Sequence, residues 1–197
     1  MTTTGALDRR PKRADARRNY DRLIEAARAE FTENGPEASL ENIARRAGVG
    51  IGTLYRHFPN RQDLLEATYL EEVEALCDST ADFAELEPWD SLVGWLNRFT
   101  QYVSTKKALS AELLATIGME SEIFKMCHTA IYAAGEPLLA RAQAAGAVRP
   151  DVTFSDVVRL VSGISMIRFA EPDQINRVLG VALDGLRYQP DAPRASH

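Results

Sequence analysis

Apolar side chains recur at intervals of three and four residues along most of the chain, which is the spacing of one face of an α-helix. Near the N-terminus, Tyr20, Ile24, Ala27 and Phe31 form such a stripe. Alternating apolar and polar runs bounded by tight-turn dipeptides, which would indicate strands, are nearly absent. The pattern predicts an all-α protein with about nine helices.

Helix-capping and helix-breaking residues set the bounds of the N-terminal helices. A helix should end before Gly35 and Pro36, because glycine adopts the left-handed cap and proline cannot continue the helix. Ser39 suits the N-cap of a short helix, and Asn60 with Asp63 suits the start of a longer one. We therefore expect four helices, over residues 16–34, 40–46, 51–58 and 61–81.

The C-terminal half predicts five more helices. Pro88 suits a first helical position, and Thr153 with Asp156 suits an N-cap and its third helical residue. Gly135 and Pro137 should kink the longest of these helices, which would make that point a hinge or the mouth of a cavity. The five helices are expected to begin near Pro88 and to cover residues 109–116, 120–145, 153–169 and 172–188.

Charge is distributed unevenly along the chain. Its 197 residues carry a net charge of −5, which argues against a nucleic-acid partner. Residues 1–62, however, hold 12 Lys and Arg against 8 Asp and Glu, a net charge of +4, which leaves −9 for the remainder. We expect a disordered basic arm over 1–15, domains over 16–76 and 77–188, and a flexible tail over 189–197.

Several classes of protein are excluded at this point. No apolar run approaches the length of a membrane span, and the N-terminus lacks the apolar core of a secretion signal. Cys77 and Cys127 fit no disulfide or zinc pattern, and adjacent Cys127 and His128 point about 100° apart on a helix. No set of catalytic side chains stands out, so we expect a cytoplasmic protein that is not an enzyme and has neither metal nor cofactor.

Residues 39–58 carry the functional signal. Two short helices separated by a glycine-containing turn are typical of a helix-turn-helix, whose second helix enters the major groove of DNA. Gly52 costs stability inside that helix, but its bare backbone permits close approach to a base edge or a phosphate. Tyr55 and His57 are common partners of phosphate and sugar, although each could also be an ordinary half-buried or surface residue.

These residues also resemble a known family. The segments Phe31 to Gly35, Ser39 to Ala44, Ala47 to Gly50, Thr53 to Phe58 and Leu64 to Leu65 are similar to the N-terminal domain of TetR-type transcriptional regulators, over residues 16–76. The resemblance implies phosphate contacts from Ser39, Thr53, Tyr55, His57 and Arg61, where lysine is usual at position 61. It also implies that Gly50, Ile51, Thr53 and Leu54 face base edges, and Arg45 is a further candidate for the DNA backbone.

The C-terminal half resembles an actinobacterial subgroup of the same family, which implies a ligand-binding and dimerisation domain. An apolar ligand pocket is expected from Trp95, Phe99, Tyr102, Leu113, Met119, Phe124, Cys127, His128, Ile131 and Met166. A two-fold four-helix interface is expected from Val157, Val161, Ile164, Ile175, Leu179, Leu183 and Leu186. The alternative for both sets is ordinary core packing.

Three functional hypotheses follow. The first is a homodimeric repressor that binds a near-palindromic DNA operator and is released by a small apolar or amphipathic effector. The second is a ligand-independent DNA-binding dimer whose C-terminal domain only dimerises or docks a partner protein. The third, an all-α enzyme with an incidental helix-turn-helix, is disfavoured because no catalytic constellation is present. A membrane partner is not expected.

Overall fold

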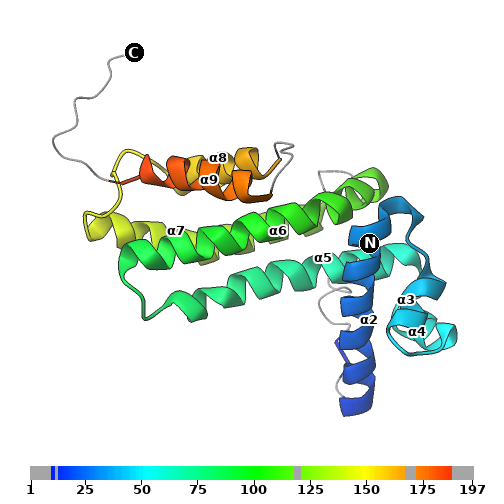
Figure 1. Cartoon of the computed structure of the whole chain (residues 1–197). Coiled ribbons are helices and arrows are strands. Elements are labelled where there is room, and N and C mark those ends of the chain that lie inside the picture. The colour runs from blue at the N-terminus through cyan, green and yellow to red at the C-terminus, as the bar shows by residue number, and fades with distance from the viewer. Residues whose placement is uncertain (1–9, 12, 118–120, 167–171, 188–197) are drawn as a thin grey trace. The chain divides into compact units, whose positions relative to one another are not determined.

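The computed structural model describes residues 10–11, 13–117, 121–166 and 172–187. Within these ranges the chain forms eight α-helices and two short 3-10 helices, and its only extended pairing is an isolated bridge between Val148 and Arg187. The predicted all-α class is therefore confirmed (Figure 1). The disordered arm expected over residues 1–15 is wrong at its end, because Ala14 and Asp15 already belong to helix α2. Residues 1–9 and 12 and the tail at 189–197 lie outside the described residues.

The helices follow the predicted order. Their bounds are α2 Ala14–Asn34, η1 Gly35–Glu37, α3 Leu40–Arg46, α4 Ile51–His57, α5 Arg61–Asp78, η2 Ser79–Phe83, α6 Pro88–Ile117, α7 Glu122–Ala144, α8 Phe154–Met166 and α9 Pro172–Asp184.

Local capping explains why several helices begin where the sequence predicts. The Ser39 hydroxyl accepts a hydrogen bond from the Asn42 amide at 3.0 Å and so caps α3. Thr153 and Asp156 cap α8 reciprocally, because the Thr153 amide donates to the Asp156 carboxylate at 2.9 Å while the Asp156 amide donates to the Thr153 hydroxyl. These bonds, above all that from the Thr153 hydroxyl, lower the pKa of Asp156.

Helix α6 differs from the prediction. The sequence suggests separate helices, one beginning near Pro88 and one over residues 109–116, but the structure has one continuous helix of 30 residues. The polar run from Ser104 to Lys107 contains neither glycine nor proline, so no helix-breaking residue separates the two predicted segments.

Helix α7 is not opened at Gly135 and Pro137, although a hinge or cavity mouth was expected there. The helix continues through Pro137 to Ala144. A Cβ at Gly135 would lie 2.1 Å from Cζ of Phe154 and 2.8 Å from the Trp95 ring. Gly135 is therefore required for close packing, because the Phe154 ring occupies the space of a side chain.

The chain divides into two compact units, each made of two separate segments. The sequence had instead predicted one domain boundary, after residue 76. Unit 1 contains residues 1–75 and 105–129, and unit 2 contains residues 76–104 and 130–197. Helices α5, α6 and α7 each contribute residues to both units. The segment 105–129, which we had assigned to the C-terminal domain, thus belongs to the same compact unit as the N-terminal helices.

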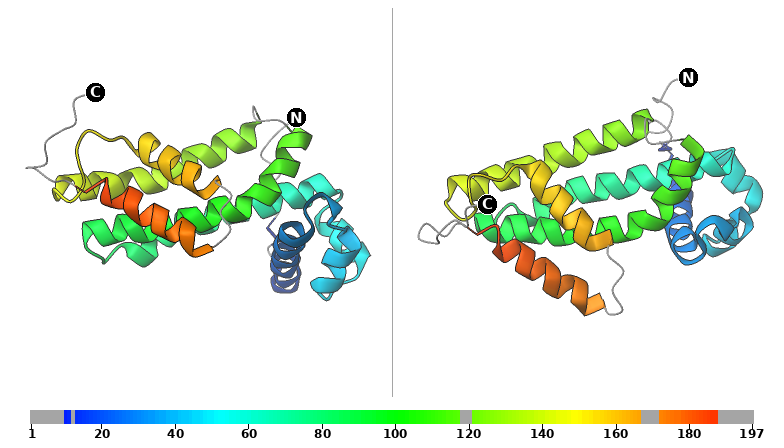
Figure 2. Two further views of the ribbon diagram at one scale, coloured as in Figure 1. Left: turned by 45° about the horizontal axis from the view of Figure 1, so that its top comes forward. Right: turned by 90° about the horizontal axis from the view of Figure 1, so that it is seen from above.

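Each unit has its own core. In unit 1, α2 packs against α3 and α3 against α4 around Leu23, Phe31 and Ile43, which are fully buried (Figure 1). In unit 2, α8 and α9 lie side by side, as Figure 2 shows, and Trp95 of α6 is fully buried with its indole N–H donating to the Leu76 carbonyl at 3.2 Å.

Candidate DNA-binding site

The turn between α3 and α4 fixes the angle at which α4 is presented. Gly48 has φ +67°, a left-handed conformation that favours glycine. The Val49 amide donates to the Ala44 carbonyl at 3.0 Å, which closes the end of α3, and α4 begins two residues later at Ile51. The two helices are thus joined by a tight, internally hydrogen-bonded turn of the kind found in helix-turn-helix motifs.

One face of α4 anchors the helix in the core of unit 1. Leu54 has no exposed surface, and Phe58 directly after the helix is equally buried. The implied role of Leu54 in contacting base edges is therefore wrong. Its side chain lies on the inward face of a seven-residue helix, which could not be held in place without such an apolar anchor.

Much of the remaining surface of α4 is open to solvent. The exposed fractions of Ile51 and Tyr55 are 38% and 46%, which are high values for large apolar or aromatic side chains. A Cβ placed at Gly50 or Gly52 would meet no atom within 4 Å, so the backbone there is accessible as well. Such a surface can contact thymine methyl groups through Ile51 and phosphate or sugar through Tyr55.

Two further residues of α4 lie at the edge of this face. Thr53 and His57 are half-buried, while Arg56 is exposed and adds a cation that our site prediction omitted. Burial, followed by the nearby charge of Arg56, lowers the pKa of His57 below its usual 6.5. The imidazole is therefore mainly neutral at pH 7 and can donate one hydrogen bond to a phosphate oxygen.

Helix α3 contributes a hydroxyl and a cation. The Ser39 oxygen accepts a bond from the Asn42 amide, which leaves the hydroxyl hydrogen available to donate to a phosphate. Arg45 is exposed, and its guanidinium donates to the Asn42 side chain at 2.9 Å. Ser39 caps α3 and Arg45 lies in its last turn, so both belong to the element that the turn joins to α4.

Arg61 does not project freely as a phosphate ligand would. Its guanidinium donates to the carbonyl of Ala38 and, at 3.4 Å, to that of Gly35, and it lies 5.0 Å from the centroid of the Phe31 ring. The expected phosphate contact is therefore not supported in this structure. Arg61 instead ties the start of α5 to the link between α2 and α3, which are 23 and 26 residues away in sequence.

This placement predicts different effects for two arginine substitutions. Arg61→Ala should lower the free energy of unfolding by about 1–2 kcal/mol, because two carbonyls lose a charged donor, and should leave the salt dependence of DNA binding unchanged. Arg45→Ala should leave stability unchanged within about 0.5 kcal/mol and reduce the salt slope by about one. Urea unfolding and binding titrations at several salt concentrations measure both; a reduced slope for Arg61→Ala would restore its phosphate role.

A buried carboxylate that sequence reasoning missed orients α3 on α2. Glu30 is almost fully buried, and its carboxylate accepts hydrogen bonds from Asn42 at 3.1 Å and from Arg46 at 3.3 Å. Arg46 also makes two hydrogen bonds to Glu33, at 2.9 and 2.7 Å, which lower the pKa of Glu33. The i, i+3 spacing of Glu30 and Glu33 on α2 was the available signal, because both side chains then face one neighbour.

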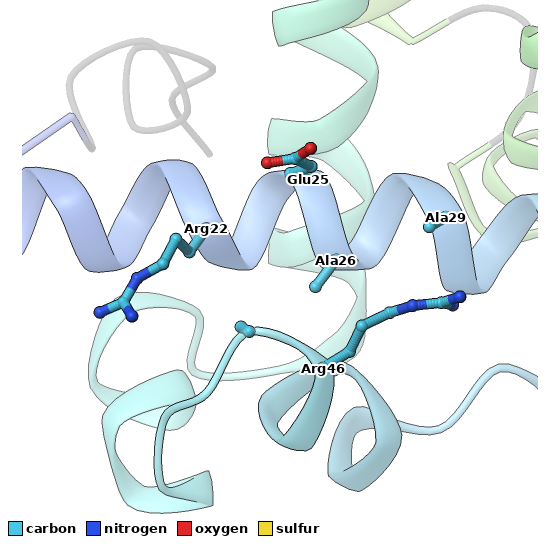
Figure 3. A pocket seen from close by; sticks show the side chains of 6 residues that line it. Arg22, Glu25, Ala26, Ala29 and Arg46 are labelled. Atoms are coloured by element: carbon cyan, nitrogen blue, oxygen red, sulfur yellow. The ribbon is translucent and has the colours of Figure 1, made fainter.

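A hollow of about 340 Å³ lies between α2 and the turn that precedes α4 (Figure 3). Its lining residues are Arg22, Glu25, Ala26, Ala29, Arg46 and Ala47. In Figure 3 the side chains of Arg22 and Arg46 extend toward opposite ends of the hollow, so their charges do not converge on one ligand. None of the residues predicted to form the ligand pocket lines this hollow.

The predicted pocket residues are mostly core residues of the two units. Trp95 and Phe99 stack with ring centroids 5.7 Å apart, and Tyr102 is nearly fully buried. Phe124 contacts Tyr69 within unit 1, where Cys127 is buried, while Ile131 is buried in unit 2. His128 is exposed, so its expected place inside a pocket is wrong. Met119 and the side chains of Leu113 and Met166 lie outside what the structure describes.

The predicted interface residues are also core residues. Six of the seven are buried within the subunit, namely Val157, Val161, Ile164, Leu179, Leu183 and Leu186, and only Ile175 is half-buried. The choice of these six for a dimer interface is therefore wrong, because the inward stripe of each helix already packs within its own subunit. The outward faces of α8 and α9 instead carry Leu160, Gly163 and Val181.

Two negative findings concern the described residues only. They include no group of three or more His, Cys, Asp or Glu side chains that could hold a metal ion. Across the same part of the chain, every helix is too short or too polar to cross a membrane.

Comparison with protein families assigns both parts of the chain. Residues 23–68 match the model of the tetR family of bacterial regulatory proteins. Residues 87–188, just over half of the chain, match the C-terminal domain of SbtR-like transcriptional regulators.

Two solved structures are similar to this chain over most of its length. A TetR transcriptional regulator of Streptomyces coelicolor is 39% identical, with a TM-score of 0.76 over 86% of this chain and 99% of that one. A TetR regulatory protein of Mycobacterium vanbaalenii is 34% identical, with a TM-score of 0.74 over 90% of this chain and 99% of that one.

Curated relatives match only part of the chain. The HTH-type regulator TtgW of Pseudomonas putida is 35% identical over 82 residues, which are 41% of this chain and 61% of that protein. An HTH-type regulator of Staphylococcus aureus is 47% identical over 53 residues, 26% of this chain and 29% of that protein. The matches thus span less than two thirds of the length of these two relatives.

The geometry and the comparisons lead to one assignment. Unit 1 presents a helix-turn-helix whose second helix is anchored on one face and open on the other, and family models match both halves of the chain. Proteins of this kind regulate transcription and are not enzymes. The chain belongs to the TetR family of bacterial transcriptional regulators.

Proposed function

We propose that this regulator is a repressor that binds a near-palindromic operator as a homodimer and leaves it when a small effector binds. The DNA-binding part of this proposal rests on helix α4, which is held by a buried side chain and exposes other side chains to solvent. Leu54 anchors it, and Ile51, Gly52 and Tyr55 face solvent. A helix held in this way can enter the major groove without losing its packing.

Contacts to DNA are divided between two kinds of residue in this proposal. Ile51, Thr53 and the open backbone at Gly50 and Gly52 read base edges. Ser39, Arg45, Tyr55, Arg56 and His57 contact phosphate or sugar and so set the register of the helix. The net charge of +4 over residues 1–62, against −9 for the rest, favours docking through the N-terminal unit.

Genomic DNA tests this part of the proposal directly. Fragments retained by the purified protein should share a near-palindromic sequence whose half-sites are one helical turn apart or slightly more. Retention of fragments without a common sequence would contradict operator recognition.

The outward faces of α8 and α9 support the dimer. The exposed fraction of Val181 is 75% and that of Leu160 is 39%, so each helix offers an apolar side chain to solvent. A Cβ at Gly163 would meet no atom within 4 Å, which leaves room for close approach by a second helix. Two such helices per subunit can form a four-helix interface around a two-fold axis.

Gly163→Arg is expected to produce a folded monomer with much weaker operator binding. The side chain fits a free subunit because the position is open, but it would place a charge inside the interface. Sedimentation gives the oligomeric state, and Ala140→Arg, at an exposed position of α7, is the matched control. A stable Gly163→Arg dimer would place the interface elsewhere.

Effector release rests on the architecture of the family and on the division of the helices. Helices α5, α6 and α7 contribute to both units. A ligand that changes the packing of unit 2 can therefore shift the equilibrium between conformations of unit 1 that bind DNA and conformations that do not. Trp95, Phe99 and Phe154 pack against one another, so a small apolar or amphipathic effector would have to open this aromatic cluster to bind there.

One experiment distinguishes the effector-released repressor from a DNA-binding dimer that needs no ligand. The protein–operator complex is treated with small-molecule extracts of bacterial cultures, fractionated by polarity. Release of the operator by a fraction that leaves the protein folded supports the effector. A complex that survives every fraction supports the ligand-independent dimer.

A further inference from the structure

The basic residue Arg10 is held on α5 by two carboxylates. Its guanidinium lies 2.7 Å from an oxygen of Glu71 and 3.6 Å from an oxygen of Glu74. Arg10 precedes α2 by four residues, whereas its partners follow 61 and 64 residues later, so the contact depends on the fold. The side chain of Arg10 remains 44% exposed, so this cation can still be reached from solvent.

Arg10 is connected through two side chains to the end of the helix that would enter DNA. Glu71 shares a hydrogen bond with Tyr20 of α2, and the Tyr20 ring centroid lies 6.3 Å from that of His57 and 5.3 Å from that of Phe58. All of these residues belong to unit 1. A series of contacts through Glu71 and Tyr20 thus links Arg10 to the C-terminal end of α4.

The surroundings of Arg10 are acidic. Burial raises the pKa of Glu71, and the charge of Arg10 opposes that shift, while Glu74 and Asp21 raise the pKa further. Three carboxylates thus gather where Arg10 is bound. A guanidinium binds carboxylate and phosphate with the same two-pronged geometry, so DNA phosphates can compete with Glu71 and Glu74 for it.

We propose that Arg10 is a further DNA-contacting residue, which Glu71 and Glu74 hold in the free protein and which exchanges to a phosphate when DNA binds. The inference rests on the proposed operator binding. Basic N-terminal arms commonly bind nucleic acid, and four residues of extended chain span about 13 Å from the start of α2. Glu71 and Glu74 therefore weaken DNA binding by competing for the arm.

A mutant cycle tests the exchange in the full-length chain. Glu71→Gln/Glu74→Gln should raise the affinity for duplex DNA about two- to fivefold, since an exposed ion pair no longer has to be broken. Arg10→Gln should lower the affinity and reduce the salt slope by about one. In the Arg10→Gln background, each glutamine substitution should raise the affinity no more than Glu25→Gln does, the control for loss of one exposed carboxylate from the same unit.

The cycle also separates the possible failures. An equal gain from the glutamine substitutions with and without Arg10 would overturn the exchange and leave only long-range repulsion between the carboxylates and DNA. If Glu71→Gln impairs folding, the exposed Glu74→Gln alone must still give a gain that depends on Arg10. Absence of duplex binding by the unmodified protein would refute operator binding itself, whereas normal binding with no coupling would refute the exchange alone.

Discussion

Replacing Leu54 with alanine is expected to lower the free energy of unfolding by about 2–5 kcal/mol and to abolish operator binding. Leu54 is fully buried and is the inward anchor of a helix of only seven residues. Such a short helix has little stability of its own, so loss of the anchor releases the face that contacts DNA. Urea unfolding followed by circular dichroism gives the stability, and titration with operator DNA gives the affinity.

Ile51→Ala is the matched control on the same helix. Ile51 is 38% exposed, so its truncation should change the free energy of unfolding by no more than about 0.5 kcal/mol while weakening DNA binding. Comparison of Leu54→Ala with Ile51→Ala therefore distinguishes an effect on the packing of α4 from an effect on DNA recognition. Equal stability of the two variants would mean that Leu54 does not anchor α4.

Gly135→Ala is expected to destabilise unit 2 by about 1–3 kcal/mol, although alanine normally favours a helix. The added methyl group would lie 2.1 Å from Cζ of Phe154 and 2.8 Å from Trp95, both in the packed aromatic cluster. These rings cannot move apart without opening the core. Fluorescence of the buried Trp95 during thermal unfolding reports the change.

Gly180→Ala supplies the comparison for this second substitution. Gly180 lies within α9, and a Cβ there would meet no atom within 4 Å. The same chemical change should therefore stabilise the protein by about 0.5–1 kcal/mol. A stabilising Gly135→Ala would show that Phe154 does not occupy the space beside Gly135.

Features set by neighbouring residues could be predicted from the sequence. Ser39, Asn60 and Thr153 each cap a helix through a partner three residues later, so the caps are visible without any knowledge of the fold. The short helices and the glycine-containing turn follow from the same local rules. For this reason α3 has the predicted bounds and α4 differs by one residue.

Features that depend on contacts between residues distant in the sequence could not be predicted in this way. Arg61 looks like a surface cation, but its hydrogen bonds run to carbonyls of Gly35 and Ala38 across the fold. Gly135 looks like a helix breaker, and only the position of Phe154 shows that it is needed for packing.

The choice of helix face was the other source of error. α8 is apolar around most of its circumference, so the pattern did not distinguish the inward stripe with Val157 and Val161 from the outward face with Leu160. Leu54 was assigned to DNA for a related reason, because a resemblance names positions without specifying which side chains are buried. Burial of each residue had to come from the packed structure.

Footprinting of the selected operator by the unmodified protein and by Tyr55→Ala tests the central claim most directly. Tyr55 is 46% exposed on the open face of α4, so its removal should leave the protein folded and dimeric. The unmodified protein is predicted to protect two half-sites on one face of the duplex, and the variant to lose this protection at the same concentration. An unchanged footprint would contradict the account, because the exposed face of α4 would then not be the surface that contacts DNA.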